Sequence, residues 1–301
     1  MKNSNCNEYN HVTLVINKCD DCPIPQCKYR QENGIPDACP YLLEQIKSAK
    51  NRLRNDPDVV RRLSKLENLS GDYDFGRGYS SNIARVGEQL LRCKEKQGEF
   101  EDKNILLLKI AALLHRLDGY NLYNYWHSSA VYAEQLLSQV SELSLYDKLA
   151  IIEAIEHHTD NENYTAPVSA ALFFGNALCL AMYHFRTDLS PEEFCKLSDY
   201  DKQAFYVRDI TFSLDQDNHK KGYLVFHYNE RGFRAYGLPP EFRPELFVER
   251  NELILGPRQV AMNFLGLDDV EILLSTRSSV CPLSEDKTLV TIPIEDFTKK
   301  K

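Results

Sequence analysis

A stretch that is apolar on nearly every side of a helix places the strongest constraint on the fold. Residues 103–117 carry Leu, Ile and Ala around most of the helix circumference, so other elements must surround this helix. An apolar stripe at helical spacing precedes it, at Ile83, Val86, Leu90 and Leu91. Residues 168–185 predict another buried helix, and helical patterns extend from about residue 41 to residue 200. The middle of the chain is therefore predicted to be all-helical.

Capping residues mark the ends of several predicted helices. Asp56 is followed by proline, which predicts a helix that begins at the proline and continues through Leu66. Ser144 predicts the N-cap of a helix that ends at a pair of histidines. Ser190 and Glu193 have the spacing of a capping box, with proline at the first helical position between them. A further short helix is expected there.

The pattern changes near residue 204. Residues 206–214 and 223–228 are rich in aromatic and β-branched side chains, and a second turn leads into residues 233–236. This pattern predicts an antiparallel meander. A short helix and a last strand are predicted further on, at residues 256–265 and 289–294.

The predicted fold class is mostly α with an α+β part, in three regions. They are a Cys-rich segment at residues 1–47, a helical domain at residues 48–200, and an α+β domain with antiparallel strands at residues 201–301. The formal net charge is −8, which gives no general attraction to nucleic acid. No uncharged apolar run is long enough to span a membrane, and the N-terminus lacks the pattern of a signal peptide. We therefore expect a cytoplasmic protein.

The first region contains a cysteine cluster that predicts a structural metal site. Cys19, Cys22, Cys27 and Cys39 lie in the segment CDDCPIPQCKYRQENGIPDACP. A C-x2-C pair supplies two thiolates from one turn, and a second pair completes the tetrahedral shell of a structural zinc site. Free thiols and an iron–sulfur cluster are the alternatives. Four thiolates leave no open coordination position, so zinc here would stabilise the fold without catalysing.

Histidines gather at predicted helix ends in the middle region. His115, His127, His157 and His158 are half of the eight histidines in the chain. A lone histidine is usually a core or surface residue without a special role. Several at corresponding helix ends can converge to bind a metal or a phosphate.

Three segments around these histidines carry a family resemblance. Residues 112–116 read Ala-Leu-Leu-His-Arg, residues 127–131 begin a helix with histidine, and residues 151–158 end in His-His after an Ile/Ala pattern. In their order and spacing, over about residues 57–187, these segments resemble the HD superfamily of metal-dependent phosphohydrolases. The resemblance implies an all-helical domain whose metal ligands include His115.

The chain departs from the family at the other principal ligand positions. Tyr79 stands where the resemblance places the first histidine, Arg116 replaces the aspartate of the His-Asp pair, and Asn176 replaces the last aspartate. A guanidinium in place of a carboxylate repels a divalent ion and favours an anion such as phosphate. We therefore expect a degenerate HD-like domain that binds a phosphate- or nucleotide-type ligand, or a protein partner, in a regulatory role. The expected ligand-binding residues are Tyr79, Arg116, His127, His157, His158 and Asn176.

Other functions remain open from the sequence. The domain could be an active phosphohydrolase with His115 and Asp118 as catalytic residues. In that case a divalent metal would be bound by His115, His127, His157 and His158, with Asp118 or Asp160 as the carboxylate. The domain could also be a purely structural helical core. A third alternative is nucleic-acid binding by C-terminal aromatic and basic residues, although such arginines are more often a solvated face. Those arginines are Arg231, Arg234, Arg243, Arg250 and Arg258.

Overall fold

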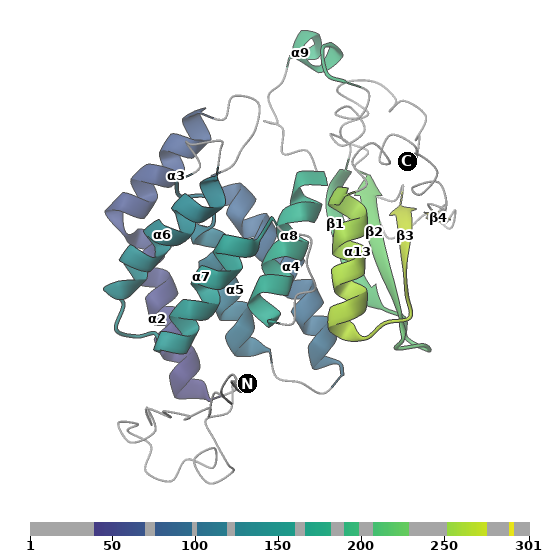
Figure 1. The fold of residues 1–301 in the computed structure, drawn as a ribbon. Helices are drawn as coiled ribbons and strands as arrows, with labels where there is room; N and C mark the ends of the chain where they lie inside the picture. Colours follow the sequence, from purple (N-terminus) through teal and green to yellow (C-terminus); the bar gives the residue numbers. More distant parts are fainter. Residues whose placement is uncertain are drawn as a thin grey trace, which may run out of the picture.

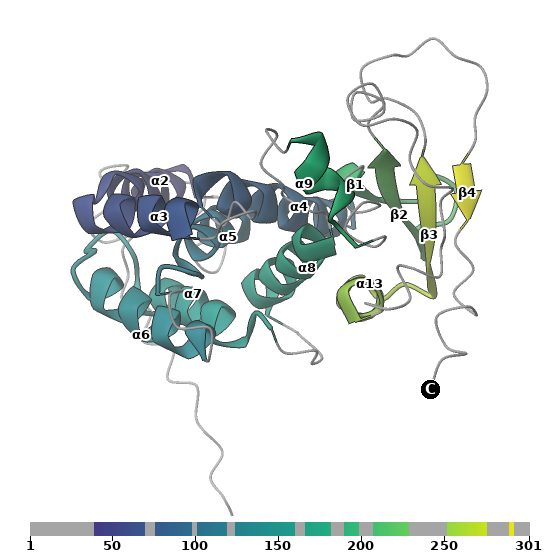
Figure 2. The same ribbon diagram turned by 90° about the horizontal axis from the view of Figure 1, so that it is seen from above.

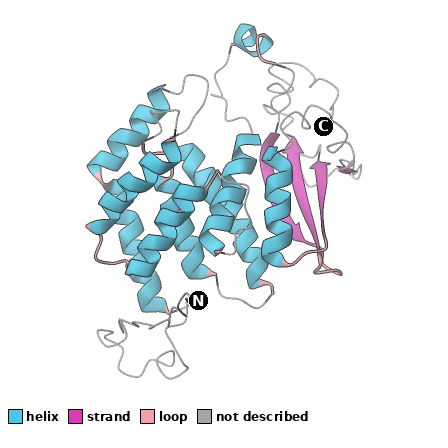
Figure 3. Cartoon of the chain, in the orientation of Figure 1, coloured by secondary structure: helices cyan, strands magenta, loops and turns pink. Residues whose placement is uncertain are grey.

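The computed structural model describes residues 39–69, 76–97, 101–118, 124–159, 166–181, 190–198, 207–228, 252–275 and 289–291. Most of these residues are helical (Figure 3). The helices in Figure 1 are α2 (Pro40–Asn55), α3 (Pro57–Leu69), α4 (Arg77–Glu95), α5 (Asp102–Leu114), α6 (Tyr125–Ser138), α7 (Leu145–His157), α8 (Pro167–Ala181), α9 (Pro191–Cys195) and α13 (Glu252–Leu265). The strands are β1 (Val207–Leu214), β2 (Lys221–Tyr228), β3 (Asp269–Ser275) and β4 (Leu289–Thr291). Within the described residues, no helix is long and apolar enough to cross a membrane.

Helix α5 is the centre of the helical part, as its sequence predicts. Seen from above, α2, α3 and α4 lie on one side of the molecule and α6, α7 and α8 on the other (Figure 2). Helix α5 packs against α2, α4, α7 and α8. Leu108, Ile110 and Ala111 are fully buried in it. An apolar helix of this kind gains its stability from burial on several sides at once.

The predicted helix starts are confirmed where a side chain makes the cap. The Asp56 carboxylate accepts the backbone N–H groups of Asp58 at 2.9 Å and Val59 at 3.2 Å, so α3 begins after it. Ser144 and Ser190 each form a complete capping box. The end of α3 differs from the prediction, because the helix continues past Leu66 to Leu69.

Two glycines let α4 and α8 approach each other closely. A Cβ atom on Gly87 would lie 2.4 Å from the Ala171 carbonyl oxygen, and one on Gly175 would lie 2.3 Å from the Ile83 carbonyl oxygen. No side chain fits at either position, so the two backbones are in direct contact there. This contact fixes the relative position of the residues that the two helices present to the interior.

The C-terminal sheet is mixed, with the strand order β1-β2-β3-β4. Strands β1 and β2 pair antiparallel, as predicted, and so do β3 and β4. Strand β3, which the sequence pattern does not predict, pairs parallel to β2, so the sheet contains a parallel pair besides the predicted antiparallel strands. Helix α13 lies between β2 and β3 in the chain and contacts β3, which makes it the crossover that a parallel pair requires. Residues 233–236 lie outside the described residues.

Helix α13 begins earlier than its proline suggests. It starts at Glu252 and contains Pro257 in its interior. Ile254, in the first turn, is buried. Its burial supports a turn of helix before the proline, at the cost of one backbone hydrogen bond.

The sheet packs directly onto the helical part. The Gln89 side chain of α4 donates to the Ile210 carbonyl at 3.2 Å and accepts the Phe212 N–H at 2.7 Å. The rings of Phe174 and Phe212 meet edge to face with centroids 5.4 Å apart. One cluster of buried residues extends from α2 to β3. The helices and the sheet thus share a core across the boundary expected near residue 200.

Candidate functional site

Most of the residues singled out by the family resemblance meet in the interior. His115 and His158 are the C-cap residues of α5 and α7. Tyr79 lies in the first turn of α4, and Asn176 lies within α8. We refer to the following residues as the buried polar cluster: Tyr79, His115, Arg116, Tyr125, His158 and Asn176.

A hydrogen bond joins Tyr79 on α4 to Asn176 on α8. The Tyr79 hydroxyl donates to Asn176 Oδ1 at 3.0 Å. Both side chains are buried, so water cannot hydrogen-bond to them and each one provides the hydrogen-bond partner of the other. The Tyr79 ring also stacks on the His115 ring, with centroids 5.9 Å apart. Tyr79 is therefore a direct neighbour of both Asn176 and His115, and its hydroxyl has a matching acceptor.

The two histidines are held in defined tautomers by backbone carbonyls. Nδ1 of His115 lies 2.7 Å from the Ala112 carbonyl oxygen. Nδ1 of His158 lies 2.6 Å from the Ile155 carbonyl oxygen. A carbonyl only accepts, so each Nδ1 carries a proton, and Nε2 of a neutral ring presents a lone pair. Nε2 of His158 lies 3.2 Å from the Tyr125 hydroxyl. Nε2 of His115 is buried and has no hydrogen-bond partner among the described residues.

Arg116 closes the cluster from the side of α6. Its Nη2 donates to the Tyr125 hydroxyl at 3.2 Å, and that hydroxyl can in turn donate to Nε2 of His158. The guanidinium lies 4.6 Å from the centroid of the Tyr125 ring and 5.5 Å from that of Tyr79. Cation–π contacts with two rings stabilise the charge in this half-buried place.

The electrostatic environment keeps the ring of His115 neutral. Burial lowers the pKa of His115 well below its usual value, and the neighbouring His158 and Arg116 lower this pKa further. Burial also raises the pKa of the Tyr79 hydroxyl, so it stays protonated and serves as a donor. The cluster therefore contains the permanent charge of Arg116 and no carboxylate.

These residues do not fit the divalent metal that the family resemblance implies. Nε2 of His115 is an available lone pair, but the neighbouring hydroxyl of Tyr79 is a donor and the guanidinium of Arg116 is a cation. A hard divalent ion needs carboxylate or carbonyl oxygens around it. Across the described part of the chain, no group of three or more His, Cys, Asp or Glu side chains could hold a metal ion.

The remaining expected residues lie apart from the cluster. The His127 side chain is 64% exposed and its Nδ1 lies 2.8 Å from Glu156 Oε1. His157 is exposed as well. The carboxylate of Asp118 forms an ion pair with Arg62 at 3.1 Å. The structure thus brings His115 and His158 together and leaves His127, His157 and Asp118 on the outside.

Sequence reasoning missed Tyr125, which links Arg116 to His158. A signal for it existed in the aromatic run Tyr123-Asn124-Tyr125-Trp126 just before His127. The loop between α5 and α6 separates Tyr125 from His115, and nothing in the local pattern indicates which aromatic ring of the run points inward.

The predicted cysteine site and basic C-terminal surface fall mostly outside the described residues. Cys19, Cys22 and Cys27 lie outside them, and Cys39 is buried at the N-cap of α2. The zinc site therefore stays a prediction. Arg258, which is described, pairs with Asp269 at 2.6 Å and donates to the Val270 carbonyl at 2.9 Å. The other four arginines of the possible nucleic-acid surface are Arg231, Arg234, Arg243 and Arg250, which lie outside the described residues.

Comparison with known proteins adds no assignment. No protein-family model matches the sequence, and no curated protein matches it.

Proposed function

We propose that this chain is a degenerate HD-like protein that binds a phosphate- or nucleotide-type ligand in a regulatory role and does not hydrolyse it. The observation that carries the proposal is the composition of the buried polar cluster. The positions assigned to metal ligands by the resemblance hold Tyr79, His115, Arg116 and Asn176, and these residues contact one another. Their proximity supports the resemblance, while their chemistry supports the loss of hydrolysis.

Hydrolysis in this family would depend on a metal-bound water, and the cluster offers little to replace it. A neutral His115 whose pKa lies well below its ordinary value is a weak general base. The Arg116 guanidinium would stabilise a phosphate oxygen but could not activate water. Asp118, the carboxylate nearest in sequence, is engaged with Arg62. Binding without turnover is the chemistry that these side chains favour.

The test is a phosphohydrolase assay on the full chain. Phosphatase and phosphodiesterase activities are measured on a panel of nucleotides with manganese, nickel or magnesium, for the natural chain and for His115→Ala. We expect the same background rate from both proteins. Metal-dependent turnover by the natural chain that disappears in His115→Ala would overturn the proposal and favour an active hydrolase with a rearranged histidine site.

A binding measurement completes the test. The same purified chain is titrated with inorganic phosphate and with the nucleotide panel by calorimetry in the absence of added metal. Saturable binding of at least one phosphate compound is expected. Absence of binding across the panel, together with absence of turnover, would leave a structural core as the better account of the helical part.

A further inference from the structure

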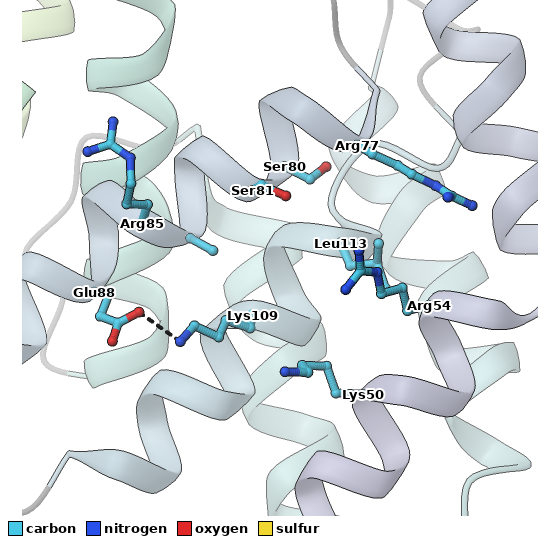
Figure 4. Close-up of a pocket in the computed structure, with 10 residues that line it drawn as sticks. Lys50, Arg54, Arg77, Ser80, Ser81, Arg85, Glu88, Lys109 and Leu113 are labelled. Atoms are coloured by element: carbon cyan, nitrogen blue, oxygen red, sulfur yellow. Dashed lines mark ion pairs between the residues drawn. The ribbon is translucent and has the colours of Figure 1, made fainter. Parts of the chain in front are cut away.

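A second feature of the helical part lies on its surface, where a cavity opens between α2, α4 and α5. Its volume is about 250 Å³. Cations from all three helices line it: Lys50, Arg54, Arg77, Arg85 and Lys109. Glu88 is the one acidic residue of the lining. Figure 4 shows Ser80 and Ser81 on α4 between Arg77 and Arg85, which point away to opposite sides, with Lys50, Lys109 and Arg54 facing them and Leu113 beside Arg54.

The cations that line this basic cavity outnumber its acidic residues. Glu88 pairs with Lys109 at 2.8 Å and also with Arg92 at 3.3 Å. Arg85 pairs with Asp209 of β1 at 2.7 Å. No ion pair is recorded for the side chains of Lys50, Arg54 and Arg77 within the described ranges. Among the described residues, the nearest recorded carboxylate contact of these three residues is that of Glu67, which accepts the backbone N–H of Arg77 at 3.1 Å and not its guanidinium.

Mutual repulsion is visible at Lys50. Its pKa is lowered, first by partial burial and then by the positive charges of Lys109, Arg54 and Lys47. Converging like charges destabilise the folded state unless a counter-charge arrives. A bound anion would supply that counter-charge.

The other lining groups also suit an anion. Ser80 is 5% exposed and lies with Ser81 in the first two turns of α4, so both hydroxyls can donate to an oxygen in the cavity. The N-terminal end of this helix, from which Arg77 projects, already has a carboxylate beside it, because the Arg77 backbone N–H donates to Glu67 Oε1 at 3.1 Å. Ala84 and Leu113 supply an apolar wall. The lining therefore combines hydrogen-bond donors and positive charge with a small apolar surface.

We infer that this cavity binds a small phosphorylated molecule, with Lys50, Arg54 and Arg77 around the phosphate and Ser80 and Ser81 donating to its oxygens. A phosphate monoester carries about −1.5 to −2 charges and three acceptor oxygens, which matches several cations better than a single carboxylate does. Arginine forks bind phosphate oxygens in pairs. A cavity of about 250 Å³ is slightly smaller than the range usual for drug-sized ligands, so the ligand is compact.

The inference rests on the proposed function in one respect, that the chain binds a phosphate compound, and it adds where that compound binds. It moves the expected anion contact from Arg116, which is engaged with Tyr125, to the basic cavity. The cavity and the buried polar cluster share no residue, so substitutions can separate them.

The experiment is a calorimetric titration of the full chain with inorganic phosphate, pyrophosphate and adenosine monophosphate, without metal. We compare the natural chain with Arg54→Ala, Lys50→Ala and Ser81→Asp, and with Lys148→Ala on α7 as the matched control. Each cavity substitution should weaken binding of the best phosphate probe about tenfold or more, because each removes or neutralises a charged contact. Lys148→Ala should leave the affinity unchanged.

Thermal unfolding of the same variants shows whether each of them is folded. Arg54 and Ser81 are exposed, and both substitutions relieve repulsion, so the melting temperature should stay equal or rise. Unchanged affinity in all three cavity variants, with affinity lost in Arg116→Gln, would overturn the inference and leave the proposed function standing. Hydrolysis of pyrophosphate or adenosine monophosphate would overturn the proposed function and leave the cavity assignment intact. Tighter binding of a phosphoserine peptide than of any small phosphate would overturn the small-molecule assignment.

Discussion

At the scale of single residues, the phenol of Tyr79 limits what the interior can bind. The Tyr79 hydroxyl donates its hydrogen bond to Asn176 Oδ1, 3.0 Å away. The buried carboxamide oxygen of Asn176 needs this donor. A histidine and an aspartate at these two positions would present lone pairs to a cation. Tyrosine and asparagine instead satisfy each other, so the pair is a structural contact between α4 and α8.

Tyr79→Phe should therefore destabilise the protein by about 1–3 kcal/mol, since it leaves the buried carbonyl of Asn176 without a donor. The free energy of unfolding is measured by chemical denaturation. Tyr146→Phe is the matched control, because the Tyr146 ring is 63% exposed, and it should change stability by a few tenths of a kcal/mol at most. Adding Asn176→Leu to Tyr79→Phe should cost less than the sum of the two single changes. Strict additivity would show that the two side chains are not coupled.

His115 predicts how stability depends on pH. Its pKa in the folded protein lies well below the ordinary value, which is about 6.5 in an unfolded chain. Below pH 6.5 the unfolded state therefore binds a proton that the folded state excludes. The contribution of His115 to stability is complete above that pH and is lost as the pH falls, by up to about 1.4 kcal/mol for each pH unit.

The measurement compares the natural chain with His115→Asn at pH 7, 6 and 5. Asparagine does not titrate, so the difference between the two unfolding free energies reports on this histidine and its coupling to His158, and the contribution of distant groups cancels. The advantage of the natural chain should shrink as the pH falls from 7 to 5. A difference that stays constant with pH would mean that His115 is protonated equally in both states.

At the scale of helices and strands, the sequence predicts the capped helix starts and the β1–β2 hairpin, and it does not predict the parallel pairing of β3. Ser144 and Ser190 cap their helices as predicted, because a cap involves only residues three positions apart. The parallel pairing of β3 depends on where α13 leads the chain, which no local pattern encodes. The basic cavity draws its cations from α2, α4 and α5, and each of them alone looks like an ordinary surface residue.

The candidate site was predictable only as far as the family resemblance extends. The resemblance pointed to Tyr79, His115, Arg116 and Asn176, and these residues contact one another in the structure. It gave no way to separate His158, which is buried, from His157, which is exposed. One residue along a helix end rotates the side chain by about 100°. That rotation decides which of the two faces the interior.

The contact of α4 with α8 leads to a prediction at this scale. Gly175→Ala should destabilise the protein by about 1–3 kcal/mol or more, because the added Cβ would lie 2.3 Å from the Ile83 carbonyl oxygen and must push the helices apart. The helix propensity of alanine opposes this by only about 1 kcal/mol. Denaturation curves measure the change. Gly222→Ala is the comparison, since its Cβ would meet only side-chain atoms at 3.1 and 3.2 Å. A larger loss for Gly222→Ala would contradict the argument.

At the scale of the whole molecule, the question is whether helices and sheet unfold together. Strand β1 is an edge strand of the sheet, and an edge leaves backbone donors and acceptors without partners. Gln89 of α4 satisfies two of them, the Ile210 carbonyl and the Phe212 N–H. The Phe174 and Phe212 rings pack across the same junction. Because α4 and α8 would expose apolar surface without the sheet, we expect a single cooperative unit among the described elements.

Gln89→Leu tests this cooperativity. The substitution keeps most of the side-chain volume but removes both hydrogen bonds to β1, so it should lower stability by about 1–3 kcal/mol. Hydrogen exchange followed by mass spectrometry reports on β1, β2, α4 and α8 separately. Exchange by global opening should accelerate by the same factor in all four, whereas Gln135→Leu on the exposed face of α6 should change none of them. Faster exchange confined to β1 and β2 would mean that the sheet opens alone, and it would restore the division near residue 200 as a boundary between two independent folding units.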